Sequence, residues 1–398
     1  RRTTPRTHST RGGILVGFMK QVVIIESSPT ATPQKVAEVL RRNGYVTVLV
    51  SLIGSDDSYS LKRAYDKRIF FDFKFFKVNF RNLLMILFYS FKKSKRIISG
   101  FLEIRRLKPY VVIARATPNW MCVLSMFIFR KYPVIYFPYD IRSFCYNSLR
   151  EAKEDGVPYF EILAERYCFQ HADGIIHKGK ENELEFLDQN IFGRKIYIKS
   201  PTLHFLPYCL NTFMVPIQNK ILKRGEIHLV FVGHVAQIES FWAELNEIVR
   251  HRIHIHLYGK TANINKEGSY NSSLASKYGA ILHSHYLHLH RQVDQEILAA
   301  EISHYDLGIW LGFHDVKKKN IAFATGNKFA SYFEAGLPFI YFKNHQYIDK
   351  LMKKFGLDLG IEFKDLAHLK DILSKHNYGE LVRRLKKARE EFEITKHI

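Results

Sequence analysis

The sequence predicts two doubly wound α/β domains that face one another across a cleft. Three observations predict this architecture: the chain is long enough for two cores, short apolar runs alternate with helical patterns, and the alternation stops once and then restarts. The chain has 398 residues, of which 46% are hydrophobic. A single hydrophobic core rarely grows beyond about 250–300 residues. A regular alternation of strand and helix is typical of parallel sheets covered by helices on both faces.

The first domain is predicted over residues 19–200. Residues 20–25 (KQVVII) form a short apolar run of the kind buried in parallel sheets. Thr32 and Pro33 supply a helix start, and residues 45–52 (YVTVLVSL) form the next strand, so the domain opens with a βαβ unit. Further strands are predicted at residues 110–114, 134–137 and 174–177.

The second domain is predicted over residues 225–373, after a linker at residues 201–224 that contains three prolines. A helix at residues 374–398 is expected to pack back across the hinge. Residues 1–18, which are rich in Arg and Thr and lack acids, are expected to be a disordered leader or an added extension. Strands of the second domain are predicted at residues 227–232, 253–257, 279–284, 307–311 and 338–342. Because ligands of such sheets bind beyond the carboxyl ends of the strands, the active site is expected in the cleft between the domains.

The composition indicates an anionic partner and a reducing compartment. The formal net charge is +22, which favours a nucleotide diphosphate, an anionic membrane surface or nucleic acid as partner. The four cysteines form no CxxC pair, which argues against a disulfide framework and against a zinc knuckle. No apolar run reaches the roughly 18 residues that span a bilayer.

The most informative segment is residues 320–342 (NIAFATGNKFASYFEAGLPFIYF). Thr325 and Gly326 form a loop, Asn327 is the expected N-cap, and Lys328 lies in the first turn of a short helix. Free backbone N–H groups and the helix dipole favour anions at such an end, and the ammonium adds a full positive charge. The segment therefore predicts a diphosphate site, although a surface helix with an incidental lysine fits the same spacing.

This segment resembles the nucleotide-sugar-binding region of the retaining, group 1 (family 4-like) glycosyltransferases of GT-B fold. Those proteins show an Asn/Ser-Lys pair, a helix and then Ala-Gly-x-Pro. Here Asn327, Lys328, Ala335, Gly336 and Pro338 stand in that pattern. Other segments agree in order and extend the resemblance over residues 19–347: 133–140, 172–179, 227–234, 257–260 and 303–310. The resemblance implies a Rossmann-like acceptor domain followed by a Rossmann-like domain for the nucleotide sugar.

The resemblance also implies an activity. The protein is expected to be a glycosyltransferase of the hexosyltransferase type, which moves a sugar from a UDP- or GDP-linked donor with retention of configuration and without a metal or other cofactor. The expected acceptor is a cell-envelope glycan or a lipid-linked saccharide of polysaccharide biosynthesis. Such a protein is expected in the cytoplasm, peripherally bound at the inner face of the membrane. Catalysis would rest on stabilising the charge that develops on the departing nucleoside diphosphate.

Site residues follow from matching this sequence to the family pattern and from strand ends. Asp140 is expected to orient the acceptor or take its proton, with a helix cap or turn role as the alternative. Glu334 is expected to replace a sugar-hydroxyl contact. Arg115 and Tyr139 are expected on the acceptor side, with a surface salt bridge as the alternative for Arg115. The expected donor contacts are Gly233, His234, Lys260, Thr325, Gly326, Asn327, Lys328 and Ser331.

Departures from the family pattern leave a second interpretation open. The two glutamates that the family often has fall on Phe323 and Ser331, and its Arg and Lys phosphate clamp falls on His234 and Glu239. Tyr139 stands where many members have a histidine. Either a divergent transferase neutralises the diphosphate with its remaining lysines and backbone N–H groups, or a non-catalytic GT-B protein binds a nucleotide, a glycan or a partner protein.

Two further patterns carry other interpretations. Histidines at alternating positions, such as His254 with His256 and His283 with His285, share strand faces, but their spacing brings together no set of three or four ligands, so no metal site is predicted. Residues 70–106 interleave aromatic and basic side chains. A core helix with a solvated basic face fits residues 82–96, and an interfacial segment on anionic lipid is the alternative. A nucleic-acid surface is not expected, because no recognised module accompanies the charge.

Overall fold

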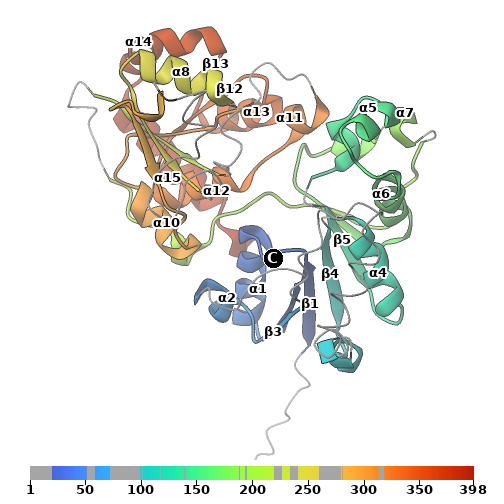
Figure 1. Cartoon of the computed structure of the whole chain (residues 1–398). Helices are drawn as coiled ribbons and strands as arrows, with labels where there is room; N and C mark the ends of the chain where they lie inside the picture. The colour runs from blue at the N-terminus through green and yellow to red at the C-terminus, as the bar shows by residue number, and fades with distance from the viewer. Residues whose placement is uncertain are drawn as a thin grey trace, which may run out of the picture.

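The computed structural model describes residues 20–51, 59–71, 99–100, 102–116, 118–138, 140–187, 189–192, 195–218, 226–233, 241–259, 279, 281–312 and 318–398. Within them the chain forms two domains, each built on a parallel β-sheet with helices packed around it (Figure 1). The predicted fold class, two doubly wound α/β domains, is therefore confirmed.

The first domain contains a seven-stranded sheet in the order β3-β2-β1-β4-β5-β6-β7. The order reverses between β1 and β4, which creates a topological switch point at their carboxyl ends. Its strands are β1 (Gln21–Glu26), β2 (Val46–Ser51), β3 (Lys67–Phe70), β4 (Val111–Ala116), β5 (Val134–Pro138), β6 (Gly174–His177) and β7 (Thr202–His204). Its helices are α1 (Ala31–Arg42), α2 (Tyr59–Ala64), α4 (Trp120–Ile128), α5 (Leu149–Glu154), α6 (Tyr159–His171) and α7 (Gln189–Phe192).

The first sheet reaches into the segment that was predicted as a linker. Strand β7 lies within residues 201–224 and pairs with β6 in parallel, with Ile175 opposite Thr202 and His177 opposite His204. The prediction was wrong here because a three-residue strand beside Pro201 carries no periodicity of its own; the pairing with β6 defines it.

The second domain contains a six-stranded sheet in the order β10-β9-β8-β11-β12-β13, with its own switch point between β8 and β11. Its strands are β8 (His228–Val232), β9 (His254–Tyr258), β10 (Leu287–His290), β11 (Leu307–Ile309), β12 (Phe339–Phe342) and β13 (Gly360–Ile361). Its helices are α8 (Trp242–Arg250), α10 (Gln295–Ile302), α11 (Lys319–Phe323), α12 (Asn327–Ala335), α13 (Gln346–Phe355), α14 (Leu369–Ser374) and α15 (Tyr378–Glu391).

One predicted strand of the second domain is displaced. A strand was expected at residues 279–284, but the structure places it at Leu287–His290, where Leu287 and Leu289 pair with Ile255 and Leu257 of β9. Residues 281–282 are helical instead, and Leu282 is buried in the core. A short apolar run does not by itself distinguish a strand from a buried helical turn.

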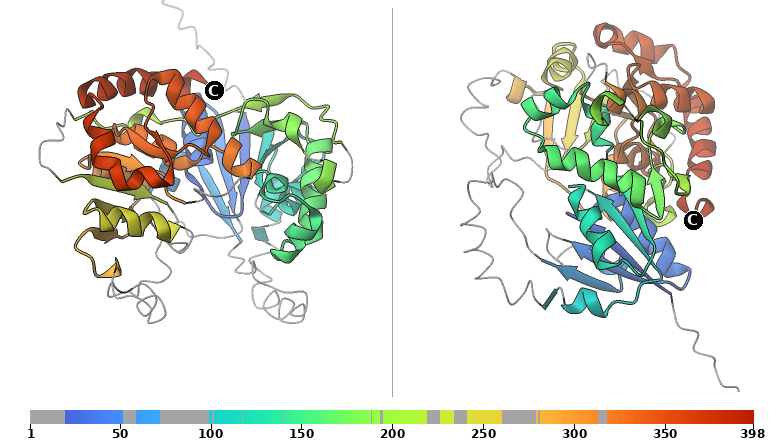
Figure 2. Two further views of the ribbon diagram at one scale, coloured as in Figure 1. Left: turned by 90° about the horizontal axis from the view of Figure 1, so that it is seen from above. Right: turned by 90° about the vertical axis from the view of Figure 1, so that its right-hand side faces the viewer.

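The hinge joins both domains to the C-terminal segment. Past α15 the chain returns to the first domain, so the C-terminus lies beside α1 in all views (Figures 1 and 2). Cys209 of the linker donates its N–H to the Phe392 carbonyl and accepts the Ile394 N–H, each at 2.8 Å. The Tyr208 ring stacks on the His397 ring with centroids 3.8 Å apart. The last residues therefore hold the linker against the first domain.

Two expectations concern residues that are not described. Residues 1–18 and residues 82–96 lie outside the described part of the chain, so the leader and the basic aromatic helix stay predictions. In the described part, none of the helices combines the length and the apolar character that crossing a bilayer requires.

Candidate functional site

The predicted diphosphate site lies at the switch point of the second sheet. Gly233 directly follows β8, Trp310 directly follows β11, and α12 begins at Asn327 beside these two strand ends. Carboxyl ends of parallel strands and the amino end of a helix thus meet at one place. Such a meeting point is where doubly wound sheets bind anionic ligands.

Lys328 is enclosed by two aromatic rings rather than by acids. Its ammonium lies 4.1 Å from the centroid of the Phe231 ring and 5.7 Å from that of the Trp310 ring. A Cβ atom added to Gly233 would meet the Lys328 Cε at 2.6 Å, so a glycine is needed for the lysine to lie across the strand end. Burial lowers the pKa of Lys328 to about 7, and no carboxylate of a described residue opposes that shift.

The neighbouring histidine adds no charge at neutral pH. The His345 ring lies 5.1 Å from the Trp310 ring and is almost fully buried. Burial, assisted by the charge of Lys328, lowers the pKa of His345 to about 4. The site therefore contains one partly ionised ammonium in apolar and aromatic surroundings, without a counter-ion among the described residues.

The predicted N-cap of α12, Asn327, was wrong by one residue. The N-cap is Gly326, with φ −111° and ψ 161°, and Asn327 is the first helical residue. The Asn327 side-chain oxygen accepts a hydrogen bond of 2.7 Å from the Thr32 hydroxyl, at the start of α1 in the other domain. Because the N-cap is a glycine, it offers no side chain to cap α12. The Phe329 N–H donates to the Gly326 carbonyl at 3.1 Å.

The first domain contacts the loop that precedes α12. The Thr325 hydroxyl donates to the Lys178 carbonyl at 2.5 Å, and the Lys178 ammonium pairs with the half-exposed Asp140 carboxylate at 3.0 Å. Thr325 and Asp140, both predicted site residues, are thus linked through Lys178. A cavity of only about 20 Å³ lies beside them, between the β5 and β6 loops and α11.

Arg115 lies at the other switch point, next to an acid that the sequence analysis passed over. Arg115 on β4 is opposite Glu26 on β1, and its guanidinium lies 5.0 Å from the Phe137 ring centroid. The Glu26 carboxylate accepts hydrogen bonds from the Thr30 N–H at 3.1 Å and the Thr30 hydroxyl at 2.6 Å. Burial raises the pKa of Glu26 to about 7, against the opposing charge of Arg115. Both groups are almost fully buried, so Arg115 does not lie on the surface.

Glu334 faces away from Lys328, and Ser331 is engaged with α10. Glu334 is fully buried, 2.5 Å from the Lys35 ammonium, and accepts the Leu210 N–H at 2.8 Å. The Ser331 hydroxyl accepts from Gln295 of α10 at 3.3 Å. On an α-helix, six residues correspond to a rotation of about 240°, so Glu334 points to the hinge when Lys328 points to the ends of β8 and β11. The expected sugar contact of Glu334 is therefore corrected to a contact within the hinge.

Three predicted residues lie outside the described part of the chain: Tyr139, His234 and Lys260. Their expected roles in acceptor and donor binding stay predictions.

The structure adds residues that the sequence analysis did not single out. Phe231 and Trp310 close around the ammonium, and each stands at the end of an apolar run that was already predicted as a strand. An acid after the first apolar run could likewise have drawn attention to Glu26. No local signal could have paired Thr32 with Asn327, because 295 positions separate them.

A cavity of about 820 Å³ lies elsewhere, between the linker and α15, and none of the predicted site residues line it. Its lining includes Val215, Ile217, Val382 and Arg389.

Comparisons with known proteins bear on the fold. No protein-family model matches the sequence, and no curated protein matches it. Solved structures match over nearly the whole chain. Sucrose-phosphate synthase from Thermosynechococcus elongatus is 11% identical, with 95% of this chain and 96% of that chain covered and a TM-score of 0.65. Anabaena HepE in complex with UDP-glucose is 9% identical, with 94% and 96% covered and a TM-score of 0.61. HepE in complex with UDP and glucose gives 9% identity, 95% and 96% coverage and a TM-score of 0.61. At these identities the similarity shows a shared fold.

Proposed function

Since the chain has the GT-B fold, we propose that it is a glycosyltransferase that binds a nucleoside-diphosphate sugar against the amino end of α12. HepE has been crystallised with UDP-glucose, and with UDP and glucose. The proposal extends the same class of ligand to this chain.

One observation carries the proposal: the half-buried Lys328 holds its ammonium against the Phe231 and Trp310 rings, without a counter-ion among the described residues. Burying an unpaired charge is unfavourable, and the lowered pKa of Lys328 expresses that cost. A pyrophosphate placed between the ammonium and the uncapped first turn of α12 would supply the missing negative charge. The site is thus complementary to a diphosphate.

The same groups would assist the chemistry. During sugar transfer, negative charge grows on the departing diphosphate, and the Lys328 ammonium and the α12 N–H groups would stabilise it. Asp140 is half exposed in the first domain, where it would orient the acceptor hydroxyl or take its proton. Lys178 holds this carboxylate next to the loop that precedes α12.

The finer assignments rest on the resemblance and on charge. We propose a retaining hexosyl transfer without a metal, with a UDP- or GDP-linked donor and a cell-envelope glycan or lipid-linked saccharide as acceptor. The net charge of +22 supports peripheral binding to an anionic membrane, where a lipid-linked acceptor would be located.

The test has two stages. Calorimetric titration with UDP and GDP should give saturable binding of at least one of them, whereas no binding of either would contradict the proposal. A panel of UDP- and GDP-sugars followed by NMR should then show transfer or slow hydrolysis with the anomeric configuration retained. Asp140→Asn should keep the nucleotide affinity of the wild type and lose turnover by about 10²–10⁴-fold, the range typical of general acid–base groups.

A non-catalytic GT-B protein is the second candidate, and the structure contains support for it. Glu334, the acid expected at the donor sugar, is fully buried in the hinge. Phe323 and Ser331 occupy the positions of the family's two glutamates. Nucleotide binding without turnover of any sugar nucleotide in the panel would support this candidate.

A further inference from the structure

Five histidines gather on one face of the second sheet, away from the candidate donor site. We call this set the histidine face: His228 on β8, His254 and His256 on β9, and His288 and His290 on β10. Each strand carries one or two of them at alternating positions, so all five project to the same side. The parallel register places the three strands next to each other and turns separate pairs into one continuous row.

Hydrogen bonds connect these imidazoles across the strands. The His228 Nδ1 lies 3.0 Å from the His256 Nε2, and the His254 Nδ1 lies 2.9 Å from the His288 Nε2. The His256 Nδ1 continues the row to the His290 Nε2 at 3.0 Å. In each pair a δ nitrogen is engaged by the ε nitrogen of the next histidine, so the orientations of the paired rings depend on one another.

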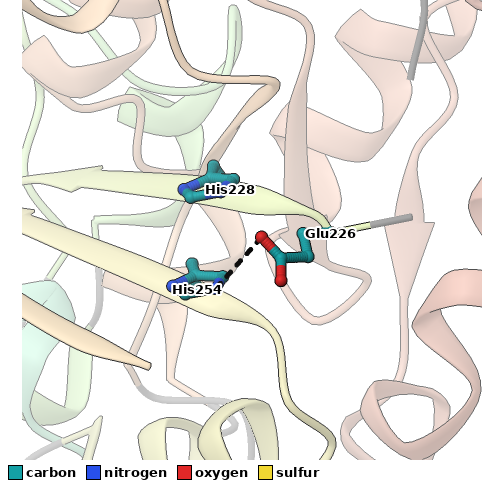
Figure 3. Close-up of side chains that lie close together, drawn as sticks. All are labelled: Glu226, His228 and His254. Atoms are coloured by element: carbon teal, nitrogen blue, oxygen red, sulfur yellow. Dashed lines mark ion pairs between the residues drawn. The ribbon is translucent and has the colours of Figure 1, made fainter. Parts of the chain in front are cut away.

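Glu226 lies next to one end of the histidine face. Glu226 immediately precedes β8, and His228 and His254 are the first residues of β8 and β9. One possible ligand atom from each of these three residues lies within 4.8 Å of the other two. The two imidazoles stack with centroids 4.3 Å apart, and the Glu226 carboxylate lies beside them, with an oxygen 3.8 Å from the His254 Nε2 (Figure 3).

The His254 Nε2 atom lacks a hydrogen-bond partner among the described residues. The atom is also buried. Leaving a buried polar atom without a partner is unfavourable. If the Nδ1 of His254 donates its hydrogen to His288, the Nε2 carries a free lone pair directed at the Glu226 side. A histidine held in this way by a second residue is the usual form of a metal ligand.

We propose that Glu226, His228 and His254 bind one divalent transition-metal ion of the Zn²⁺ class, with His256 and His288 orienting the two ligating imidazoles. Two imidazole nitrogens and a carboxylate suit Zn²⁺, Co²⁺ or Ni²⁺ better than Mg²⁺ or Ca²⁺, which prefer oxygen ligands. A water molecule would complete a tetrahedral site.

Binding requires the three ligand atoms, which lie within 4.8 Å of one another, to move closer together. Ligand atoms about 2.0–2.2 Å from a tetrahedral Zn²⁺ lie roughly 3.4 Å from one another. The 3.8 Å separation of Glu226 and His254 must shrink by a few tenths of an ångström, and the stacked rings must tilt toward the ion. Glu226 is 65% exposed, so its side chain can adjust and the ion can enter from solvent. Lys370, whose charge reaches His254, opposes a bound cation, and Glu226 offsets it.

The location indicates what the ion would do. Strands β8 and β9 begin at the amino edge of the sheet, whereas the candidate donor site lies at the carboxyl edge. The ion would fasten the first residues of β8, which follow the interdomain linker, to β9. We therefore assign the ion a stabilising role at the entrance of the second domain.

The test uses the full chain, without a histidine tag and after treatment with a chelator. Titration with Co²⁺ should show absorption bands of a tetrahedral ion that saturate at one equivalent, and Zn²⁺ should displace them. Glu226→Gln, which changes an exposed side chain, should weaken Co²⁺ binding by about tenfold or more. Zn²⁺ should raise the melting temperature of the wild type and not that of Glu226→Gln.

A matched control separates this site from general surface binding. Glu247 and His251 of α8 form another contact between a carboxylate and an imidazole, at 3.3 Å, and the histidine face is not part of it. Glu247→Gln should leave Co²⁺ affinity unchanged. His228→Asn, monitored by circular dichroism for correct folding, should behave like Glu226→Gln. Equal Co²⁺ affinity of the wild type and Glu226→Gln would overturn the proposal, and so would tight binding of Mg²⁺ in place of Co²⁺.

Discussion

Two enclosed lysines lie close to helix α12 and differ in their partners. Lys35 of α1 lies 2.5 Å from the Glu334 carboxylate of α12, and both side chains are almost fully buried. Lys328, in the first turn of the same helix, contacts the rings of Phe231 and Trp310 and pairs with no acid of a described residue.

The difference distinguishes a structural cation from a binding cation. In a buried ion pair each charge offsets the other, and Lys35 with Glu334 joins the two domains across the hinge. An enclosed ammonium without an acid is unfavourable until an anion reaches it. The two lysines therefore predict opposite results for the same substitution.

The largest effect is expected at the paired lysine. Lys35→Met leaves the Glu334 carboxylate buried and unpaired, which should lower the free energy of unfolding by about 3–5 kcal/mol. Urea denaturation followed by tryptophan fluorescence measures this loss. The double variant Lys35→Met with Glu334→Leu removes both charges and should recover most of it. Equal stability of the single and double variants would show that the pair does not hold the hinge.

The next effect concerns ligand binding at the unpaired lysine. Lys328→Met should raise the dissociation constant of UDP or GDP, whichever binds the wild type, by about 30–100-fold. This corresponds to about 2–3 kcal/mol for a charge-assisted contact. Calorimetry measures it. Lys353→Met, on the exposed surface of α13, removes the same net charge and is the matched control. A similar loss in both variants would reduce the role of Lys328 to a contribution to overall charge.

Local sequence patterns predicted most of the elements in this comparison. Contacts between residues far apart in the sequence determined the partners of the two lysines. Apolar runs and helix stops predicted most strands of both sheets and the short helix that carries Lys328. They could not predict that Glu334 pairs with Lys35, because that contact depends on how the two domains meet. Spacing along the helix suggested that Glu334 lies near the donor, whereas the rotation of about 100° per residue turns it to the hinge.

The histidine face shows the same limit. Alternation along β9 predicted that His254 and His256 share one side of the sheet. Only the strand order β10-β9-β8 brings His288 and His228 next to them. A sequence gives the side on which a residue projects, but it does not say which strand is the neighbour.

A smaller effect is expected when pH changes the affinity for UDP or GDP. The pKa of Lys328 is lowered to about 7 in the free protein, and a bound diphosphate should raise it again. Binding then requires uptake of a proton above pH 7, so the affinity for UDP or GDP should fall by up to about tenfold per pH unit between pH 7 and pH 9. Titrations at three pH values measure the slope. Lys328→Met should show no such slope, and an equal slope in that variant would assign the titration to another group.

The smallest effect is a difference in melting temperature between variants of the two lysines, measured without ligand. The pKa of Lys328 is about 7 in the folded chain against an ordinary value of 10.5. The unfolded chain therefore binds more protons between these values, and stability rises with pH across that window. The cost of enclosing Lys328 is fully present below pH 7 and disappears as the pH approaches 10.5. Lys328→Met removes this cost, so its melting temperature should exceed that of the wild type by roughly 2–4 °C at pH 6.5, and the difference should shrink by pH 9. Lys35→Met should melt below the wild type at both pH values, and a fall in melting temperature for both variants at pH 6.5 would mean that Lys328 also has an acidic partner.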